Sequence, residues 1–187
     1  LSLMPTPAHN IRTTLEWVKD DVFQAHASDY DDIDYTAGYE VEELLTLAAA
    51  VTLSATAVSK VETGFISDQL ESVALRQALA GATSRYPDNP LIHALFGHYA
   101  KRQLVLKQTA SRDQRWKQVL ANALTEIDQA IAILTDKASP KELRDYKELV
   151  YTCCDRVARA ARRSPLDQQQ ISPAEAAILA KITAALG

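Results

Sequence analysis

The hydrophobic positions of this chain recur every three or four residues, which is the spacing of an amphipathic α-helix. The pattern covers most of the 187 residues, and no stretch alternates as a half-buried strand would. It predicts seven helices, over residues 9–26, 40–62, 67–85, 90–108, 112–136, 140–163 and 173–186. Because short connections favour antiparallel neighbours, we expect an all-α fold: one compact bundle of about six to seven antiparallel helices. The bundle would span 1–187 as a single domain, with 1–8 and 27–38 irregular.

Several of these helices begin at a recognisable capping sequence. Ser139 and Ser172 are each followed by proline at the first helical position and by glutamate at the third. Asn89 also precedes a proline, and Ser67 and Ser111 are further N-cap candidates. Such side chains stabilise a helix because its first N–H groups have no partner within it.

The helix over 40–62 is the expected centre of the bundle. Between Glu43 and Lys60 it has no charged residue, so we expect other helices to surround it. Its alanines are small enough to let those neighbours approach closely. The uncharged stretch is shorter than the roughly 20 apolar residues that cross a bilayer and contains several threonines and serines, so no membrane segment is expected.

The formal net charge of −4 conceals two halves of opposite sign. Residues 1–100 contain 5 Lys or Arg and 14 Asp or Glu, a net charge of −9, whereas residues 101–187 contain 15 and 10, a net charge of +5. A chain that is negative overall lacks the basic footprint of a nucleic-acid-binding protein. We therefore expect no nucleic-acid partner.

The negative charge is concentrated in a segment without a basic residue, formed by Asp29, Asp31, Asp32, Asp34, Glu40, Glu42 and Glu43. One interpretation is a solvated loop that leads into the positive N-terminus of a helix. A second is a site for Ca²⁺ or another divalent cation. Asp32, Asp34, Glu40 and Glu43 fall at positions 1, 3, 9 and 12 of a calcium-binding loop, although position 6 is Ala37 where that loop requires glycine. A third is the docking of a protein partner.

A basic face is expected near the end of the helix over 140–163. Arg156, Arg159 and Arg163 are spaced by three and four residues, which places them on one side of a helix. They either complement the negative end of the helix dipole or bind a phosphate or an acidic partner. The acidic segment, beginning with Asp29 and Asp31, is one candidate for such a partner, within one chain or between two copies.

The cysteines and histidines do not form a recognisable site. Cys153 and Cys154 are adjacent, and Cα atoms about 3.8 Å apart are too close for an ordinary disulfide. We expect both to be reduced and packed as small apolar residues in a cytoplasmic protein, with a vicinal redox pair as the alternative. The first residue is Leu, so a removed signal stays an alternative to that location. His93 and His98 lie about 140° apart around a helix, which does not suit two metal ligands.

Two helix starts carry an isoleucine–serine pair followed by a glutamate: Glu62–Ser67 with Glu71, and Ile171–Glu175. They resemble a signature of TerB-like domains, the all-helical family named for tellurite resistance, although Glu62-Thr63-Gly64 replaces the family's Asp-Gly pair. The resemblance covers less than a fifth of the chain. It implies a stress-linked or metal-responsive bundle, with Glu62 as the acidic ligand that carries over.

No segment matches a nucleophile elbow, a P-loop, a dinucleotide-binding glycine fingerprint or a zinc-protease helix. The leading hypothesis is therefore a non-enzymatic helical bundle that acts through protein–protein interaction or self-association. Its partner would be another protein or a second copy of the chain. The alternative is a cation- or small-ligand-binding domain, and an undetected hydrolase or transferase is a weaker third hypothesis.

Overall fold

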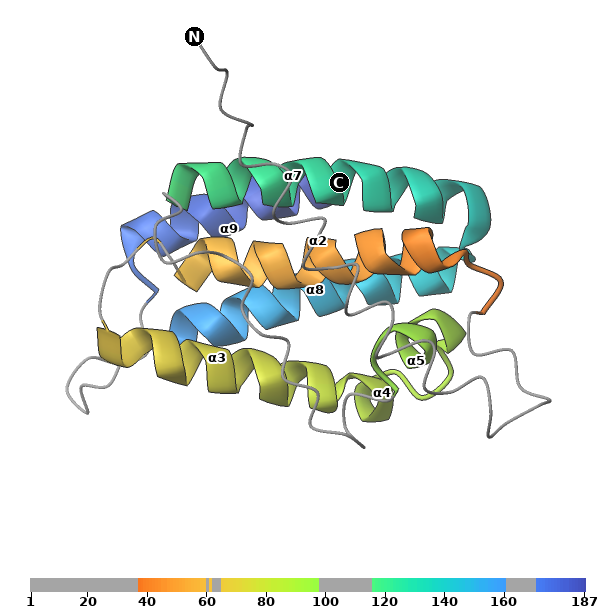
Figure 1. Ribbon diagram of the computed structural model, residues 1–187, viewed down its shortest axis with the longest axis horizontal. Helices are drawn as coiled ribbons and strands as arrows, with labels where there is room; N and C mark the ends of the chain where they lie inside the picture. The colour runs from red at the N-terminus through yellow and green to blue at the C-terminus, as the bar shows by residue number, and fades with distance from the viewer. Residues whose placement is uncertain (1–36, 60, 62–64, 98–115, 161–170) are drawn as a thin grey trace, which may run out of the picture.

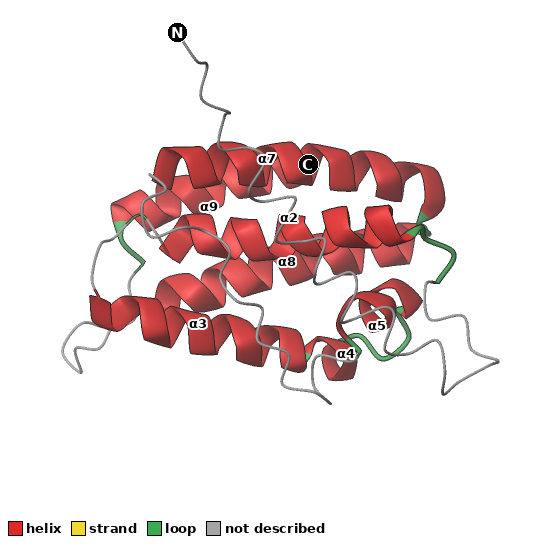
Figure 2. Ribbon diagram, in the orientation of Figure 1, coloured by secondary structure: helices red, strands yellow, loops and turns green. Residues whose placement is uncertain are grey.

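A computed structural model describes residues 37–59, 61, 65–97, 116–160 and 171–187 of the chain. Within these ranges it contains helices and no strand, which confirms the all-α prediction (Figure 2). The predicted helix over 9–26 lies outside the described residues. The helices are α2 (Val41–Ser59), α3 (Phe65–Ala80), α4 (Ala82–Arg85), α5 (Pro90–Phe96), α7 (Trp116–Lys137), α8 (Pro140–Ala160) and α9 (Pro173–Leu186).

The helices form a bundle in which α2 is central, as the sequence predicts (Figure 1). α2 packs most extensively against α7 and α8, and it also contacts α3, α5 and α9. α3 covers the side of α8 that faces away from α7 (Figure 1). α7 and α9 run antiparallel to α2 and α8, whereas α2 and α8 are parallel neighbours (Figure 1). α7 and α8 follow each other in the chain but make few contacts, because α2 packs against both.

The boundaries of the predicted helix over 67–85 are wrong in two respects. The segment forms two helices, α3 and α4, with Gly81 between them at φ −87° and ψ −4°. Glycine has a low helix propensity, which favours a break between two helices at this position. In addition, α3 begins at Phe65, so Ser67 lies inside the helix and is not its N-cap.

Three of the predicted caps are confirmed. The Ser139 Oγ accepts a hydrogen bond from the N–H of Glu142 at 3.2 Å, and the Glu142 carboxylate accepts one from the Ser139 N–H at 2.9 Å. Ser172 and Glu175 form the same reciprocal box at the start of α9. Asn89 caps α5 by accepting from the N–H three residues further on. The predicted cap Ser111 lies outside the described residues.

α2 can be buried on most sides because hydroxyl groups on it form hydrogen bonds within the helix. The Ser54 hydroxyl donates to the Ala50 carbonyl at 2.6 Å, and the Thr56 hydroxyl donates to the Thr52 carbonyl at 2.8 Å. Polar groups bonded within their own helix can be buried without the penalty of an unpaired donor. By length and composition α2 is the one described helix that could cross a membrane, but 56% of that segment is buried inside the protein, as in a core helix.

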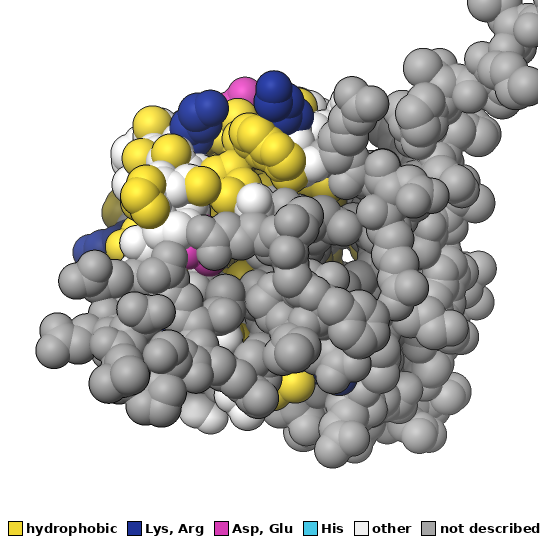
Figure 3. All heavy atoms as spheres, turned by 90° about the vertical axis from the view of Figure 1, so that its left-hand side faces the viewer, with side chains coloured by type: hydrophobic (Ala, Val, Ile, Leu, Met, Phe, Trp, Pro, Cys, Tyr) yellow, Lys and Arg dark blue, Asp and Glu magenta, His cyan; other side chains and the backbone are white. Residues whose placement is uncertain are grey.

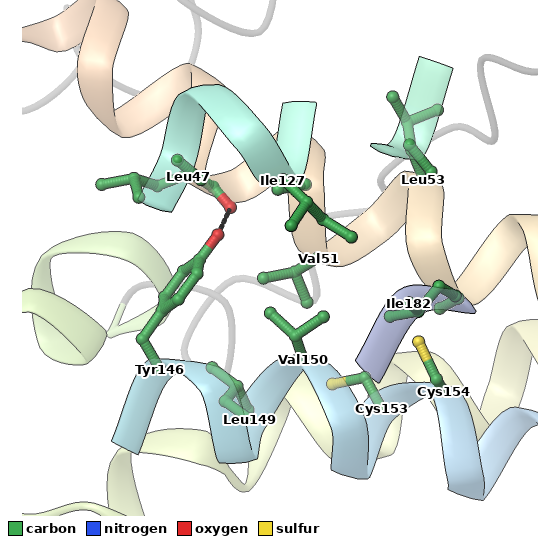
Figure 4. Packing of buried hydrophobic residues seen from close by; sticks show 14 of the residues in the cluster. Leu47, Val51, Leu53, Ile127, Tyr146, Leu149, Val150, Cys153, Cys154 and Ile182 are labelled. Carbon is green, nitrogen blue, oxygen red and sulfur yellow. Dashed lines mark hydrogen bonds between the residues drawn. The ribbon is translucent and has the colours of Figure 1, made fainter. Parts of the chain in front are cut away.

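The hydrophobic core lies where α2, α7, α8 and α9 converge. Figure 4 shows side chains from all four helices meeting there, among them Leu47, Val51, Ile127, Val150 and Ile182. Tyr146 is also fully buried, and its hydroxyl donates to the Leu47 carbonyl at 2.7 Å (Figure 4). This bond fixes the register of α8 against α2, so the beginnings of the two parallel helices lie at the same end of the bundle.

Candidate interaction surface

The acidic residues that the structure describes lie at the start of α2. One carboxylate oxygen of Glu43 accepts from the Glu40 N–H at 2.8 Å and from the Lys137 ammonium at 2.7 Å. The hydrogen bond from Lys137 and then that from the Glu40 N–H hold the pKa of Glu43 below its ordinary value. Glu43 thus caps α2 and joins it to the end of α7. The other predicted ligands and docking residues of this segment, Asp29, Asp31, Asp32 and Asp34, lie outside the described residues.

The turn before α2 has a left-handed backbone conformation, for which a calcium-binding loop uses glycine. Ala37 and Gly38 both have positive φ, 52° and 83°, which is the left-handed region that glycine favours. The next residue, Tyr39, is buried, and its ring lies 5.9 Å from the Lys137 ammonium. Burial, with the nearby charges of Glu142 and Glu43, raises the pKa of Tyr39 to about 12. The turn therefore places an aromatic ring and a cation beside Glu43.

We expect Ca²⁺ to leave the melting temperature unchanged, because Lys137 already occupies the Glu43 carboxylate. In the described ranges, no three His, Cys, Asp or Glu side chains come together as a metal site. Thermal melting with Ca²⁺, Mg²⁺, Zn²⁺ and a chelator measures this directly, since a cation that binds only the folded chain raises the midpoint. A midpoint that rises with one cation and falls with the chelator would restore the cation hypothesis.

The arginines lie at the opposite end of the bundle from these acids. Arg156 and Arg159 are exposed on the last turns of α8, and Arg159 Nε lies 2.8 Å from a carboxylate oxygen of Asp155. Arg163 lies outside the described residues. The distance between them follows from the contact of the Tyr146 hydroxyl with the Leu47 carbonyl. Glu40 lies seven residues before Leu47, and along α8, Arg159 lies thirteen residues after Tyr146. At 1.5 Å per helical residue, about 21 Å separates Glu43 from Arg156 and about 30 Å separates Glu40 from Arg159 along the bundle, so these acids and arginines do not pair within one chain.

A second exposed feature, which the sequence interpretation missed, is the outward side of α9. Its hydrophobic residues Ile178, Leu179, Ile182 and Leu186 face the core as predicted. Its exposed side includes a single charged residue and is otherwise built of small or uncharged residues: Pro173, Ala174, Ala176, Ala177, Ala180, Lys181, Thr183 and Ala184. We call these eight residues the α9 face. A surface helix normally carries a charged outer side, so the near absence of charge here was the signal available in the sequence.

An exposed aromatic residue borders the α9 face. The Lys147 ammonium donates to the Gly187 carbonyl at 3.0 Å, which places this side of α8 against the end of α9. Tyr151 follows Lys147 by one helical turn on the same side and is 45% exposed. Trp116, 38% exposed, begins α7 at the end of the bundle where α9 also begins. Figure 3 looks onto this end, where described hydrophobic side chains are exposed beside Lys and Arg.

The two cysteines are free and buried in the core (Figure 4). Burial raises the pKa of the Cys153 thiol to about 12, against the opposing effect of Arg156 and Arg85, and it raises the pKa of Cys154 well above its ordinary value. A redox cysteine reacts as the thiolate. Burial and the raised pKa values favour the packing of both thiols as small apolar side chains over the alternative of a vicinal redox pair.

In the part of the chain that the structure describes, the protein is an all-α helical bundle with acidic residues at the start of α2, arginines at the end of α8 and a single charged residue, Lys181, on the outer side of α9. No family model matches the chain, and no curated protein or solved structure matches it either. Of the two TerB-like stretches, Ile171–Glu175 forms the capped start of α9. Glu62, the acidic residue that the resemblance carries over, lies outside the described residues.

Proposed function

We propose that this chain is a non-enzymatic helical bundle that acts by self-association. The observation that carries the proposal is the separation of charge along the bundle: exposed Glu40 lies at the start of α2, and exposed Arg156 lies about 26 Å away near the end of α8. Opposite charges held this far apart by rigid helices cannot neutralise each other within one chain. They are free to do so between two chains.

Two copies that lie side by side in opposite directions bring each acidic end against an arginine end. The same contact then occurs twice about a two-fold axis, so the assembly closes as a dimer. In the sequence, four aspartates at positions 29, 31, 32 and 34 precede Glu40. Contacts between exposed charges weaken with salt, because the screening length falls from about 10 Å at 0.1 M to about 3 Å at 1 M.

Light scattering of the full chain after size exclusion tests the proposal. We expect twice the mass of one chain at about 0.05 M salt and the mass of one chain at about 1 M salt. Arg156→Glu combined with Arg159→Glu should abolish the dimer at low salt. Arg144→Glu is the matched control, since Arg144 is exposed on the first half of the same helix. A chain that is monomeric at every salt concentration and retains no protein partner would overturn the proposal.

A further inference from the structure

We infer that one side of α2 is the docking site for the predicted helix over residues 9–26 of the same chain, packed antiparallel to α2. This side, which we call the α2 face, consists of Val41, Leu45, Ala48, Thr52 and Thr56. These residues are spaced by three or four positions, so they lie along one line of the helix, and all five are partly exposed. The remaining positions of α2 from 44 to 59 are buried, apart from Thr46. The inference does not depend on the proposed self-association.

The α2 face has the chemistry of a surface that packs against another helix. It carries no charged side chain, whereas the exposed side of a surface helix normally does. The Thr52 hydroxyl donates to the Ala48 carbonyl at 3.1 Å, and the Thr56 hydroxyl donates to the Thr52 carbonyl at 2.8 Å. Both hydroxyls therefore have partners within α2 and need none from water. In Figure 1, α2 lies in front of α8, with α7 above it and α3 below, and no described helix passes in front of it.

The predicted helix over 9–26 matches the α2 face in length and in pattern. Its 18 residues would extend about 27 Å, and the 19 residues of α2 extend about 28 Å. Its apolar side consists of Ile11, Leu15, Val18 and Val22. An apolar side of this length is stable only when another surface covers it. The partly exposed, uncharged side of α2 is such a surface.

The spacing of the two surfaces also sets their register. Ile11 and Val22 are eleven residues apart, and Leu45 and Thr56 are eleven residues apart as well. Antiparallel packing that places Val22 beside Leu45 therefore places Ile11 beside Thr56 at the same time. Parallel packing would require the connecting residues to cross the whole length of α2.

The turn before α2 supports the antiparallel direction. Ala37 and Gly38 form a turn and both have positive φ, 52° and 83°. Two consecutive positive φ values occur in type I′ turns, which reverse the direction of the chain. Ten residues, 27–36, connect the predicted helix to this turn. A short connection of this kind favours consecutive helices that lie side by side in opposite directions.

Cross-linking in the full chain tests both the contact and its direction. Val22→Cys combined with Leu45→Cys, treated with a short thiol-specific cross-linker, should give a link within one chain. Ile11→Cys combined with Thr56→Cys should do the same. Val22→Cys with Thr56→Cys is the matched control and should give no link, because eleven helical residues separate the two positions on α2 by about 16 Å. The two native cysteines give little background, since both are buried.

A double-mutant cycle gives a second, independent measurement. For residues in contact, the effects of Val22→Ala and Leu45→Ala on the unfolding equilibrium constant should not multiply, and we expect a deviation of at least about 3-fold. In the control cycle Leu143→Ala replaces Leu45→Ala, because Leu143 is also a partly exposed leucine but lies on α8. Its effect should multiply with that of Val22→Ala to within about 2-fold.

The outcomes decide between this site and other arrangements. Internal links in both pairs and none in the control, with coupling confined to Val22 and Leu45, would support the inference. Links that join two chains would overturn it, because the segment would then cover a second copy. Equal linking in the control, or neither linking nor coupling, would also overturn it. Light scattering of the native chain tests the proposed self-association separately, so either proposal can fail without the other.

Discussion

Replacement of Tyr146 by alanine is expected to lower the free energy of unfolding by about 4 kcal/mol. The side chain is fully buried between α2 and α8, and its hydroxyl donates to the Leu47 carbonyl at 2.7 Å. The substitution removes a large apolar ring, leaves a cavity where the two helices meet and loses the hydrogen bond. Denaturant unfolding at high salt, where the chain is expected to be monomeric, measures the change.

Two variants show whether this loss arises from burial. Tyr146→Phe keeps the ring and removes only the hydroxyl, so it should cost about 1 kcal/mol. Tyr151→Ala is the matched control on the same helix, because that tyrosine is 45% exposed, and it should change stability by less than about 0.5 kcal/mol. Equal losses for Tyr146→Ala and Tyr151→Ala would contradict the packing described for α8.

Replacement of Asn89 by alanine is expected to lower the free energy of unfolding by about 2–3 kcal/mol. The buried Asn89 side chain accepts from the Ile92 N–H at 3.0 Å and donates to the Asp145 carboxylate at 3.1 Å. The substitution therefore removes the cap of α5 and also takes a donor from a buried carboxylate. Asn122→Ala is the control, because the Asn122 side chain makes only an exposed bond to Gln118, and it should have little effect.

The contribution of Asn89 should depend on pH through Asp145. Burial alone would raise the pKa of this carboxyl, but the hydrogen bonds from Lys141 and Asn89 outweigh it and hold the pKa below its ordinary value. A carboxyl with a lowered pKa stabilises the folded state above its unfolded-state pKa, about 3.9, and loses that contribution as pH falls through the folded-state value. The difference between native and Asn89→Ala chains should therefore narrow below about pH 4. A constant difference would assign the whole effect to the cap.

The candidate interaction surface could be predicted only in part. The arginines of α8 could be located, because their spacing of three and four residues places them on one side of any helix. The α9 face was missed, since the apolar period of that helix was assigned entirely to the core, and alanine is common both inside and outside helices. The metal interpretation of Glu43 depended on its spacing from Asp32. Spacing carries no information on Lys137, which lies 94 residues further along the chain.

What the sequence determined by itself is local. The helical period and the capping residues Ser139, Ser172 and Asn89 act over three or four residues, so most helices begin where those residues predict. Only the tertiary structure decided which helices are neighbours: α2 packs between α7 and α8 and runs parallel to α8, although the connection of α7 to α8 predicted a packed hairpin. Because α2 is nearly uncharged, its burial on several sides stabilises the fold. The local sequences of α7 and α8 carry no information on this contribution. The separation of the acids from the arginines follows from this arrangement, and so does the proposed self-association.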